Sequence, residues 1–147
     1  MTSIRPAGKE DAPALAYLFD QYRQFYGQQS DPEGAADFLK ARLEAGESVV
    51  YLALEEGELC GFCQLYPIFS SVSMRRAWLL NDLYVHESFR KKGIASKLLD
   101  AVVTMAAEQK APWLLLQTGA ANTVAQALYE QKGWVRESDL FYRYDID

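Results

Sequence analysis

Three cations come directly before a glycine in the stretch "NDLYVHESFRKKGIASKLLDAVVTMA". They are Arg90, Lys91 and Lys92, and the residues after Gly93 repeat apolar side chains with helical spacing. The first backbone N–H groups of a helix are unpaired and favour an anion, and a glycine lets the backbone come close to it. This arrangement predicts a site for a diphosphate, and the alternative is an ordinary solvated helix start.

The whole chain is acidic, which limits the partners that this basic group can have. Its 147 residues carry a formal net charge of −5 at pH 7, and 50% of them are hydrophobic. Nucleic-acid binding depends mainly on basic surface, so no nucleic-acid partner is expected. No run approaches the ~18 to 20 apolar residues of a membrane span, and the first residues lack the order of a secretory signal. We therefore expect one soluble, cytoplasmic domain, residues 1–147, with no membrane partner.

The two cysteines form the pattern C-x-x-C, which is typical of redox sites when it begins a helix. Cys60 and Cys63 instead lie in "GELCGFCQLYP", a run with strand character, where residues three apart point to opposite faces and lie roughly 10 Å from each other. We expect both thiols to be buried and unpaired. His86 is the single histidine, so the chain has too few suitable ligands for a zinc site, and no metal is expected.

The order of the expected elements is that of an α/β (α+β) protein. Apolar spacing predicts helices over residues 11–26, 32–45, 94–109 and 122–132, and Asp31 and Pro32 begin the second of them. Strands are predicted over residues 2–7, 48–55, 58–69, 74–87 and 113–118, and two further strand-like pieces lie within 134–146. Short connections favour an antiparallel meander of the second to fourth strands, and a crossover helix makes the next strand parallel.

Two motifs give the chain a family resemblance. Arg90-x-x-Gly93-x-Ala95 matches the [QR]-x-x-G-x-[GA] signature of the GNAT superfamily of acyl-CoA N-acyltransferases, whereas G-x-x-x-x-G-K-[ST] and G-x-G-x-x-G do not fit here. The stretch "AANTVAQALYEQKGW" is similar to the helix that follows in that family. The resemblance implies the GNAT fold, a mixed, mostly antiparallel sheet of six or seven strands with about four helices. Lys91 departs from the family pattern, because a glycine is common at its position.

The resemblance implies acetyl-CoA as the cofactor and CoA as a product. Backbone N–H groups of the loop would hold the diphosphate, the end of the preceding strand would pair with pantetheine, and Asn122 would bind the pantetheine arm. Tyr129 matches the family tyrosine that protonates the departing thiolate, and its alternative role is packing in the core. The expected cofactor-binding residues are Leu83, Tyr84, Val85, Arg90, Lys91, Lys92, Gly93, Ile94, Ala95, Ser96, Asn122 and Tyr129.

The implied reaction is direct attack of an amine on the acetyl thioester in a ternary complex. A lysine-like amine with a pKa of ~10.4 is almost entirely protonated at neutral pH, so a base or a water relay must take a proton from it. Asp82, late in the fourth predicted strand, is the leading candidate for this base, followed by Glu87 and His86. The alternative for Asp82 is a structural role, in which it hydrogen-bonds backbone near a strand bulge.

The resemblance implies an acceptor pocket formed largely by the first two helices and the loop around residues 67–75. Its candidate aromatic residues are Tyr22, Tyr26, Tyr66 and Phe69. The alternative for the same side chains is packing in the core. We expect a small-molecule amine that is cationic as the substrate. The alternatives are a lysine or the N-terminus of a protein, or a non-catalytic CoA-binding sensor or interaction module. A homodimer is compatible with these expectations.

Overall fold

The computed structural model describes residues 1–146, and the chain forms two compact units. The first unit, Met1–Gln117, holds the whole sheet and three α-helices. The second begins at Thr118 and holds one α-helix, α4 (Thr123–Gln131). The organisation of residues 1–147 as a single domain stays a prediction.

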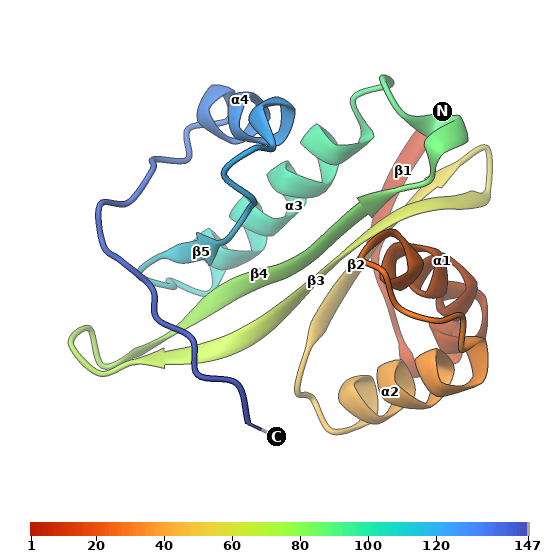
Figure 1. Cartoon of the computed structure of the whole chain (residues 1–147), viewed down its shortest axis with the longest axis horizontal. Coiled ribbons are helices and arrows are strands. Elements are labelled where there is room, and N and C mark those ends of the chain that lie inside the picture. Colours follow the sequence, from red (N-terminus) through yellow and green to blue (C-terminus); the bar gives the residue numbers. More distant parts are fainter. Residues whose placement is uncertain (147) are drawn as a thin grey trace. The chain divides into compact units, whose positions relative to one another are not determined.

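The first unit is built on a five-stranded sheet with the strand order β1-β2-β3-β4-β5 (Figure 1). The first four strands pair antiparallel with their neighbours in sequence, and β5 runs parallel to β4 because helix α3 connects the two. The predicted meander and the predicted parallel crossover are therefore both confirmed. The strands are β1 (Thr2–Pro6), β2 (Val49–Glu55), β3 (Glu58–Ser70), β4 (Arg75–Val85) and β5 (Leu114–Leu116).

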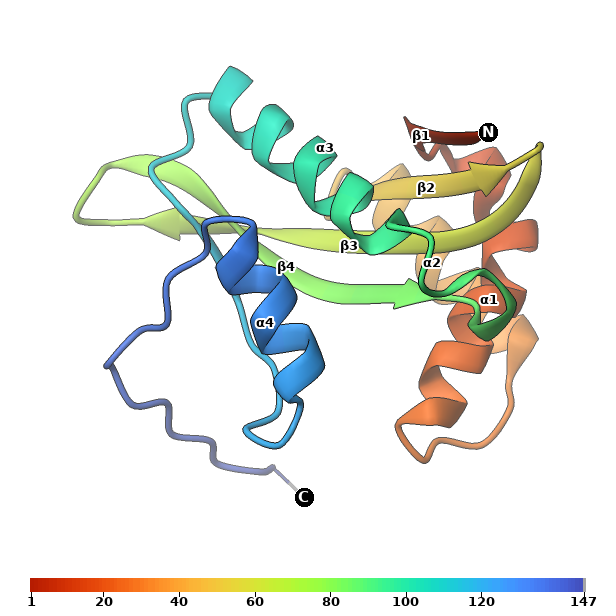
Figure 2. The same ribbon diagram turned by 90° about the horizontal axis from the view of Figure 1, so that it is seen from above.

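Helices cover both faces of this sheet (Figure 2). The helices α1 and α2 pack together on one face, and α3 lies on the other face. With α4 they make the four α-helices that the sequence predicts. The bounds in this unit are α1 (Ala12–Phe25), α2 (Pro32–Glu44) and α3 (Ile94–Glu108), with two short 3-10 helices, η1 (Lys9–Asp11) and η2 (Glu87–Phe89).

Strand β3 separates two cores because its side chains alternate between the faces. Phe62 points towards α1, and its ring centroid lies 5.9 Å from that of Phe19 and 5.7 Å from that of Tyr22. Gly61 points towards α3, and a Cβ atom there would lie 3.5 Å from the Ile94 side chain. The buried residues of α3 on this second face are Ile94, Leu98, Leu99, Val102, Met105 and Ala106.

The connection between α1 and α2 is fixed by the buried carboxylate of Asp20. This carboxylate accepts hydrogen bonds from the Ser30 hydroxyl at 2.7 Å, from the Asp31 backbone N–H at 2.6 Å and from the Gln24 amide at 3.0 Å. Burial opposes the ionisation of Asp20, but the three donors outweigh it, and the pKa lies below its ordinary value. Asp31 is the N-cap that the sequence predicts, and its side chain accepts from the Gly34 N–H at 3.0 Å.

The prediction of six or seven strands is wrong, because the sheet has five. The two strand-like pieces within residues 134–146 form no strand. Alternating apolar residues suit a strand, but a strand forms only where a neighbouring segment supplies backbone partners. The side chains of Val135, Leu140, Tyr142 and Tyr144 are instead 78% exposed or more. β5 is also shorter than the predicted strand over residues 113–118.

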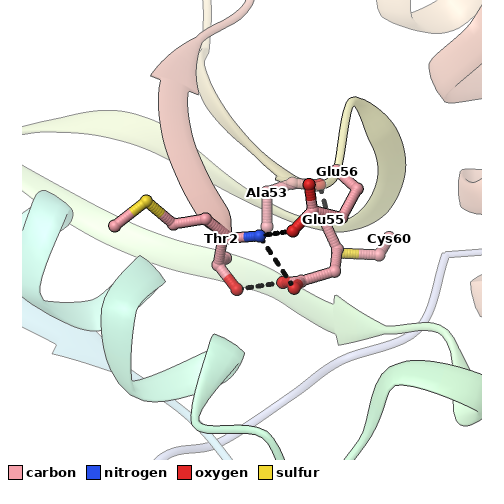
Figure 3. A network of polar contacts seen from close by, with 6 residues as sticks. Thr2, Ala53, Glu55, Glu56 and Cys60 are labelled. Atoms are coloured by element: carbon pink, nitrogen blue, oxygen red, sulfur yellow. Dashed lines mark hydrogen bonds and ion pairs between the residues drawn. The ribbon is translucent and has the colours of Figure 1, made fainter.

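Polar contacts hold the N-terminus of the chain against the end of β2 (Figure 3). The amino group of Met1 contacts the carboxylates of Glu55 and Glu56, and the Thr2 hydroxyl donates to Glu55. The hydrogen bond from Thr2 lowers the pKa of Glu55, and the charge of the N-terminus acts in the same direction. These contacts hold the edge strand β1 in register with β2.

Both cysteines are buried and free, as the sequence predicts. Cys60 lies beside a register shift between β2 and β3, and its thiol donates to the Ala53 carbonyl at 3.4 Å (Figure 3). Burial raises the pKa of the Cys63 thiol to about 12. Cys63 is therefore protonated at neutral pH and is not a reactive thiolate.

Candidate active site

The outer edge of β4 is open over its last five residues. β5 pairs with β4 only at residues Trp78–Leu80, so the β4 edge over residues 81–85 has no strand beside it within the described part of the chain. Alternate N–H and C=O groups of such an edge are free to pair with an extended ligand, in the manner of an added strand. This edge contains Leu83, Tyr84 and Val85, the three residues expected to pair with pantetheine.

The open edge is followed by the connection over residues 86–93, which contains η2, and then by the N-terminus of α3. The helix begins after Gly93, which has a φ of +76° and provides no side-chain cap, and its first backbone bond runs from the Lys97 N–H to the Gly93 carbonyl. The N–H groups of Ile94, Ala95 and Ser96 precede that first bond and are those that a helix leaves unpaired. A helix of 15 residues therefore presents its positive end beside the open strand edge.

Lys91 adopts the left-handed conformation that glycine favours, with a φ of +64°. A non-glycine residue in this region carries roughly 1 to 2 kcal/mol of backbone strain. Lys91 therefore carries backbone strain that a glycine at this position would not carry. The backbone is nevertheless left-handed at both Lys91 and Gly93.

Two of the three cations of the loop, Arg90 and Lys92, lie over aromatic rings. The Arg90 guanidinium lies 5.5 Å from the centroid of the Tyr84 ring, and its Nε donates to the Val85 carbonyl at 2.9 Å. The Lys92 ammonium lies 5.3 Å from the centroid of the Phe89 ring. Arg90 therefore folds back over the end of β4 and joins the open edge to the loop, and both cations remain exposed.

Asp82 sits at the start of the open edge, inside a network of polar side chains. Its carboxylate accepts hydrogen bonds from the Tyr22 hydroxyl at 2.8 Å, the Gln64 amide at 2.9 Å and the Asn81 amide at 3.1 Å. Asp82 is 7% exposed and Gln64 is fully buried. The network connects α1, β3 and β4 at one point of the sheet.

Two phenols near Asp82 stay protonated at neutral pH. Burial raises the pKa of Tyr22, and the charge of Asp82 and the hydrogen bond to it raise the pKa further. Burial and the charge of Asp82 raise the pKa of Tyr66 to about 12. Tyr22 is therefore a permanent hydrogen-bond donor to Asp82 in the physiological range.

The structure brings three of the four predicted acceptor-site aromatics to this network. The rings of Tyr22 and Tyr26 meet edge to face with centroids 5.1 Å apart, and Tyr66 interacts electrostatically with both Asp82 and Tyr22. Tyr26 is 65% exposed and offers an accessible ring. Phe69 lies on the opposite face of β3 from Tyr66, because their positions differ by three.

Phe69 takes part in a different cluster. The Arg76 guanidinium lies 5.4 Å from the Phe69 ring centroid and 5.6 Å from that of Trp78. The Trp78 indole N–H donates to Gln109, the residue that ends α3, at 3.2 Å. Phe69 therefore belongs to the face of the sheet that α3 covers.

Two of the three donors to Asp82, Gln64 and Asn81, are not among the site residues predicted from the sequence. Gln64 is cross-strand partner to Asp82, so the two side chains are neighbours on one face of the sheet. The available signal was a single amide among the largely apolar residues "LCGFCQLYP" of β3. The other candidate bases lie past the end of β4, where the His86 Nδ1 accepts from the Ser88 N–H at 3.1 Å and Glu87 begins η2.

The second unit contains the other two predicted site residues. Asn122 is the N-cap of α4, and its side-chain oxygen accepts from the Ala125 N–H at 3.2 Å. This bond occupies the oxygen and leaves the amide NH₂ group as a donor. The Tyr129 ring centroid lies 6.3 Å from that of Trp134, and the Trp134 N–H donates to the Tyr129 carbonyl at 2.9 Å.

Residues 1–146 contain neither a candidate metal site nor a helix that could span a membrane. No group of three or more His, Cys, Asp or Glu side chains is placed to hold a metal ion. Among the helices of the same residues, none combines the length and the apolar character needed to cross a bilayer.

Comparison with known proteins gives consistent matches over most of the chain. The model of the family described as "Acetyltransferase (GNAT) family" matches residues 15–134. The uncharacterized N-acetyltransferase YhfO of Bacillus subtilis is 52% identical over 136 residues, which are 92% of this chain and 91% of YhfO. The D-amino-acid N-acetyltransferase HPA3 of Saccharomyces cerevisiae is 28% identical, over 95% of this chain and 89% of HPA3.

Solved structures extend the comparison to the fold. A crystal structure of a probable acetyltransferase has a TM-score of 0.89 at 46% identity and covers 99% of this chain and 97% of that chain. The ribosomal-protein-alanine N-acetyltransferase of Brucella melitensis biovar Abortus 2308 has a TM-score of 0.83 at 25% identity, over 99% of this chain and 100% of that chain.

Proposed function

The chain belongs to the acetyltransferase (GNAT) family, and from this premise we propose that it transfers the acetyl group of acetyl-CoA to the primary amine of a small cationic molecule. That the chain is an N-acetyltransferase follows from the family and from its named relatives. The donor, the acceptor and the mechanism are the proposed parts.

One observation carries the choice of acetyl-CoA: the open edge of β4 ends at the N-terminus of α3. The pantetheine of CoA is an extended chain with two amides, which suits pairing with a strand edge. Its diphosphate suits the N–H groups of Ile94, Ala95 and Ser96, with Arg90 and Lys92 supplying positive charge. The residues present therefore fit both parts of this donor.

The proposed reaction needs one proton acceptor and one proton donor from this chain. Asp82 takes a proton from the ammonium of the acceptor, which frees the nitrogen lone pair for attack on the thioester carbonyl carbon. As the new C–N bond forms and the C–S bond breaks, Tyr129 gives its hydroxyl proton to the departing sulfur. The second proton that the nitrogen loses on becoming an amide passes through water and restores the Tyr129 hydroxyl. Outward backbone N–H groups along the open edge of β4 are suited to bind the oxygen that becomes negative.

Two observations support a small cationic acceptor. The chain carries a net charge of −5, and the proposed base contacts Tyr22, whose ring meets that of Tyr26 edge to face; such rings suit a cation. The name of the relative HPA3 specifies a D-amino acid as its substrate. The likeness to a ribosomal-protein-alanine N-acetyltransferase supports the N-terminus of a protein as the second candidate.

A panel of amines tests the proposed function directly. With acetyl-CoA as donor, we expect spermidine, D-lysine or kanamycin to release CoA faster than a peptide beginning with alanine, because the small cations suit the acidic, aromatic site. CoA release would be measured with a thiol reagent, and the acetylated product by mass spectrometry. Faster reaction of the peptide would favour the second candidate, and binding of acetyl-CoA without any turnover would favour a non-catalytic sensor.

The loop assignment is tested by the change Gly93→Val. Gly93 has a φ of +76°, where a β-branched residue is strained, and the added side chain also crowds the approach of the diphosphate. We expect the affinity for acetyl-CoA to fall about tenfold or more, which corresponds to ~1.4 kcal/mol. Isothermal titration calorimetry on the folded variant measures this.

The matched control is Gly46→Val. Gly46 ends α2 with a φ of +66° and, like Gly93, has no atom within 4 Å of an added Cβ. The control thus introduces similar strain away from the loop and is expected to leave acetyl-CoA affinity unchanged. Equal affinities of the Gly93→Val variant and the wild type would show that this loop does not hold the diphosphate.

A further inference from the structure

The three donors to the Asp82 carboxylate fill its two oxygens unequally. Tyr22 and Asn81 both donate to Oδ1, at 2.8 and 3.1 Å, whereas Gln64 alone donates to Oδ2, at 2.9 Å. An ionised carboxylate has about two acceptor positions on each oxygen. Among the described residues, Oδ1 is therefore saturated and Oδ2 keeps one position for another proton donor.

Gln64 is held in one orientation at a cost to stability. Because a carboxylate only accepts, the amide nitrogen of Gln64 must face Asp82, which leaves the amide oxygen on the other side. That oxygen is buried and has no hydrogen-bond partner within residues 1–146. An apolar side chain of similar size would avoid this unmet acceptor. The buried amide is therefore better explained by what its N–H does for Asp82 than by the stability of the core.

A β-bulge brings Asp82 to the face where these donors lie. Gln64 pairs with Asp82, but the next residue of β3, Leu65, pairs with Leu80, so Asn81 is an extra residue in β4. Neighbouring residues of β3 point to opposite faces, and their partners Asp82 and Leu80 therefore do so as well. The bulge turns Asp82 towards α1, and it also brings the Asn81 amide to the carboxylate.

We propose that Gln64 and Tyr22 are positioning residues, which hold the Asp82 carboxylate so that its Oδ2 is the atom that accepts the proton of the acceptor amine. This inference rests on the proposed function, in which Asp82 is the base. In the step, an N–H bond of the ammonium breaks, an O–H bond forms at Oδ2, and the electron pair stays on the nitrogen. Tyr22 keeps its own proton throughout, and Gln64 stays neutral.

The titratable neighbours of Asp82 keep one charge state near neutral pH. The charge of Asp82 acts on three titratable neighbours, Tyr22 from α1 and Cys63 and Tyr66 from β3. Arg42 from α2 is the cation that acts on Tyr66. Burial raises the pKa of all three neutral neighbours, to about 12 for Cys63 and Tyr66. None of them changes charge between about pH 5 and about pH 9, so a limb of the pH–rate profile that moves within that range does not arise from these three neighbours.

The first test replaces Gln64 in two ways. Gln64→Met removes the donor to Oδ2, and we expect kcat to fall about tenfold with little change in KM for the fastest amine of the panel. Gln64→Glu places a second carboxylate beside Asp82, and two such groups share one proton. The acidic limb of the pH–rate profile should then move to higher pH by about one unit or more.

Gln24→Met is the matched control for Gln64→Met. The Gln24 amide donates to another buried carboxylate, that of Asp20, at 3.0 Å, which lies in the α1–α2 connection. This control removes an amide donor from a carboxylate without touching Asp82, and the pH–rate profile should stay that of the wild type. A purely structural Gln64 would lower the melting temperature of its variants and leave their acidic limb in place.

The second test replaces Tyr22 and can be carried out even if the Gln64 variants do not fold. Tyr22→Phe removes one of the two donors to Oδ1 and keeps the ring, and we expect the acidic limb to move to higher pH, because the charged carboxylate loses a donor. Tyr51→Phe, which removes a half-buried hydroxyl from β2, is its control and should leave the limb in place. If no amine is turned over, carboxyl ¹³C NMR of Asp82 measures the same displacement without a substrate.

The outcomes separate this inference from the proposed function. An Asp82→Asn variant as active as the wild type would remove the base itself. The positioning roles alone would be overturned if Asp82→Asn is slow but the acidic limb of the pH–rate profile stays at its wild-type position in Gln64→Glu and Tyr22→Phe. The positioning roles would be supported if the acidic limb moves in both Gln64→Glu and Tyr22→Phe and stays in place in the controls Gln24→Met and Tyr51→Phe.

Discussion

Replacing Asp82 by asparagine is expected to lower kcat/KM for a primary amine by about 10²-fold or more at pH 7, the scale of general-base assistance. A lysine-like amine with a pKa of ~10.4 is neutral in only about one molecule in a thousand at that pH. Asparagine keeps the size of the side chain and one acceptor oxygen but cannot take a proton. The variant must therefore rely on the small neutral fraction of the amine, and steady-state CoA release measures the loss.

The pH dependence of that loss distinguishes a base from a structural carboxylate. As the pH rises, more of the amine arrives neutral, so the rate of the Asp82→Asn variant should approach that of the wild type. A structural Asp82 would instead impair the protein at every pH. Parallel profiles of the variant and the wild type would contradict the assignment, and Glu87 and His86 would be the next residues to replace.

Asp20→Asn is the matched control for this experiment. Asp20 is 4% exposed and also accepts from three donors, but it lies in the connection between α1 and α2. Its pKa is lowered in the folded chain, so its contribution to stability is present above the ordinary carboxyl pKa and is lost as the pH falls through the folded value. We expect this variant to lose stability at neutral pH, seen as a lower melting temperature, and to keep its rate per folded molecule.

Replacing Tyr129 by phenylalanine is expected to lower kcat by about 10²-fold, with little change in the affinity for acetyl-CoA. The change keeps the ring and its contact with Trp134 and removes only the hydroxyl. A departing thiolate, with a thiol pKa of ~8.5, leaves more readily when a phenol of ordinary pKa ~10 can give it a proton. The defect should therefore appear in turnover, measured as CoA release, while calorimetry shows normal binding.

Tyr142→Phe provides the control for this prediction. Tyr142 lies in the same unit of the chain and is 92% exposed, so the loss of its hydroxyl should change neither turnover nor binding. An unchanged kcat in the Tyr129→Phe variant with a good amine substrate would remove Tyr129 from the mechanism. Equal losses of binding and turnover would instead indicate that the hydroxyl helps to bind acetyl-CoA and does not act only on the departing sulfur.

Local features of the sequence predicted the parts of this protein that depend on neighbouring residues. Asp31 followed by Pro32 marks the start of α2, since a side-chain cap and a fixed φ act within one helical turn. The cations and the glycine before residue 94 mark the start of α3 for the same reason. The order of strands β2 to β4 followed from short connections, which join only antiparallel neighbours. These interactions span few residues, so the order of the residues is enough to reveal them.

The number of strands depended on contacts that the sequence does not reveal. Residues 134–146 alternate as a strand does, yet they form none, because alternation describes side chains whereas a strand requires backbone partners from elsewhere in the chain. The register between β3 and β4 also depends on contacts that the sequence does not reveal. One extra residue at Asn81 decides which face Asp82 occupies, and no local pattern specifies where a pairing shifts.

The composition of the candidate site divides in the same way. The sequence by itself determined that a carboxylate late in β4, a cationic loop with a glycine and several aromatic residues are present, because residue types and short motifs carry that information. Only the tertiary structure decided that Tyr22 and Gln64, 60 and 18 residues from Asp82 in the chain, both donate to its carboxylate. Hydrogen bonds act over about 3 Å, and the folding of α1 against the bulged sheet brings these three side chains within that distance.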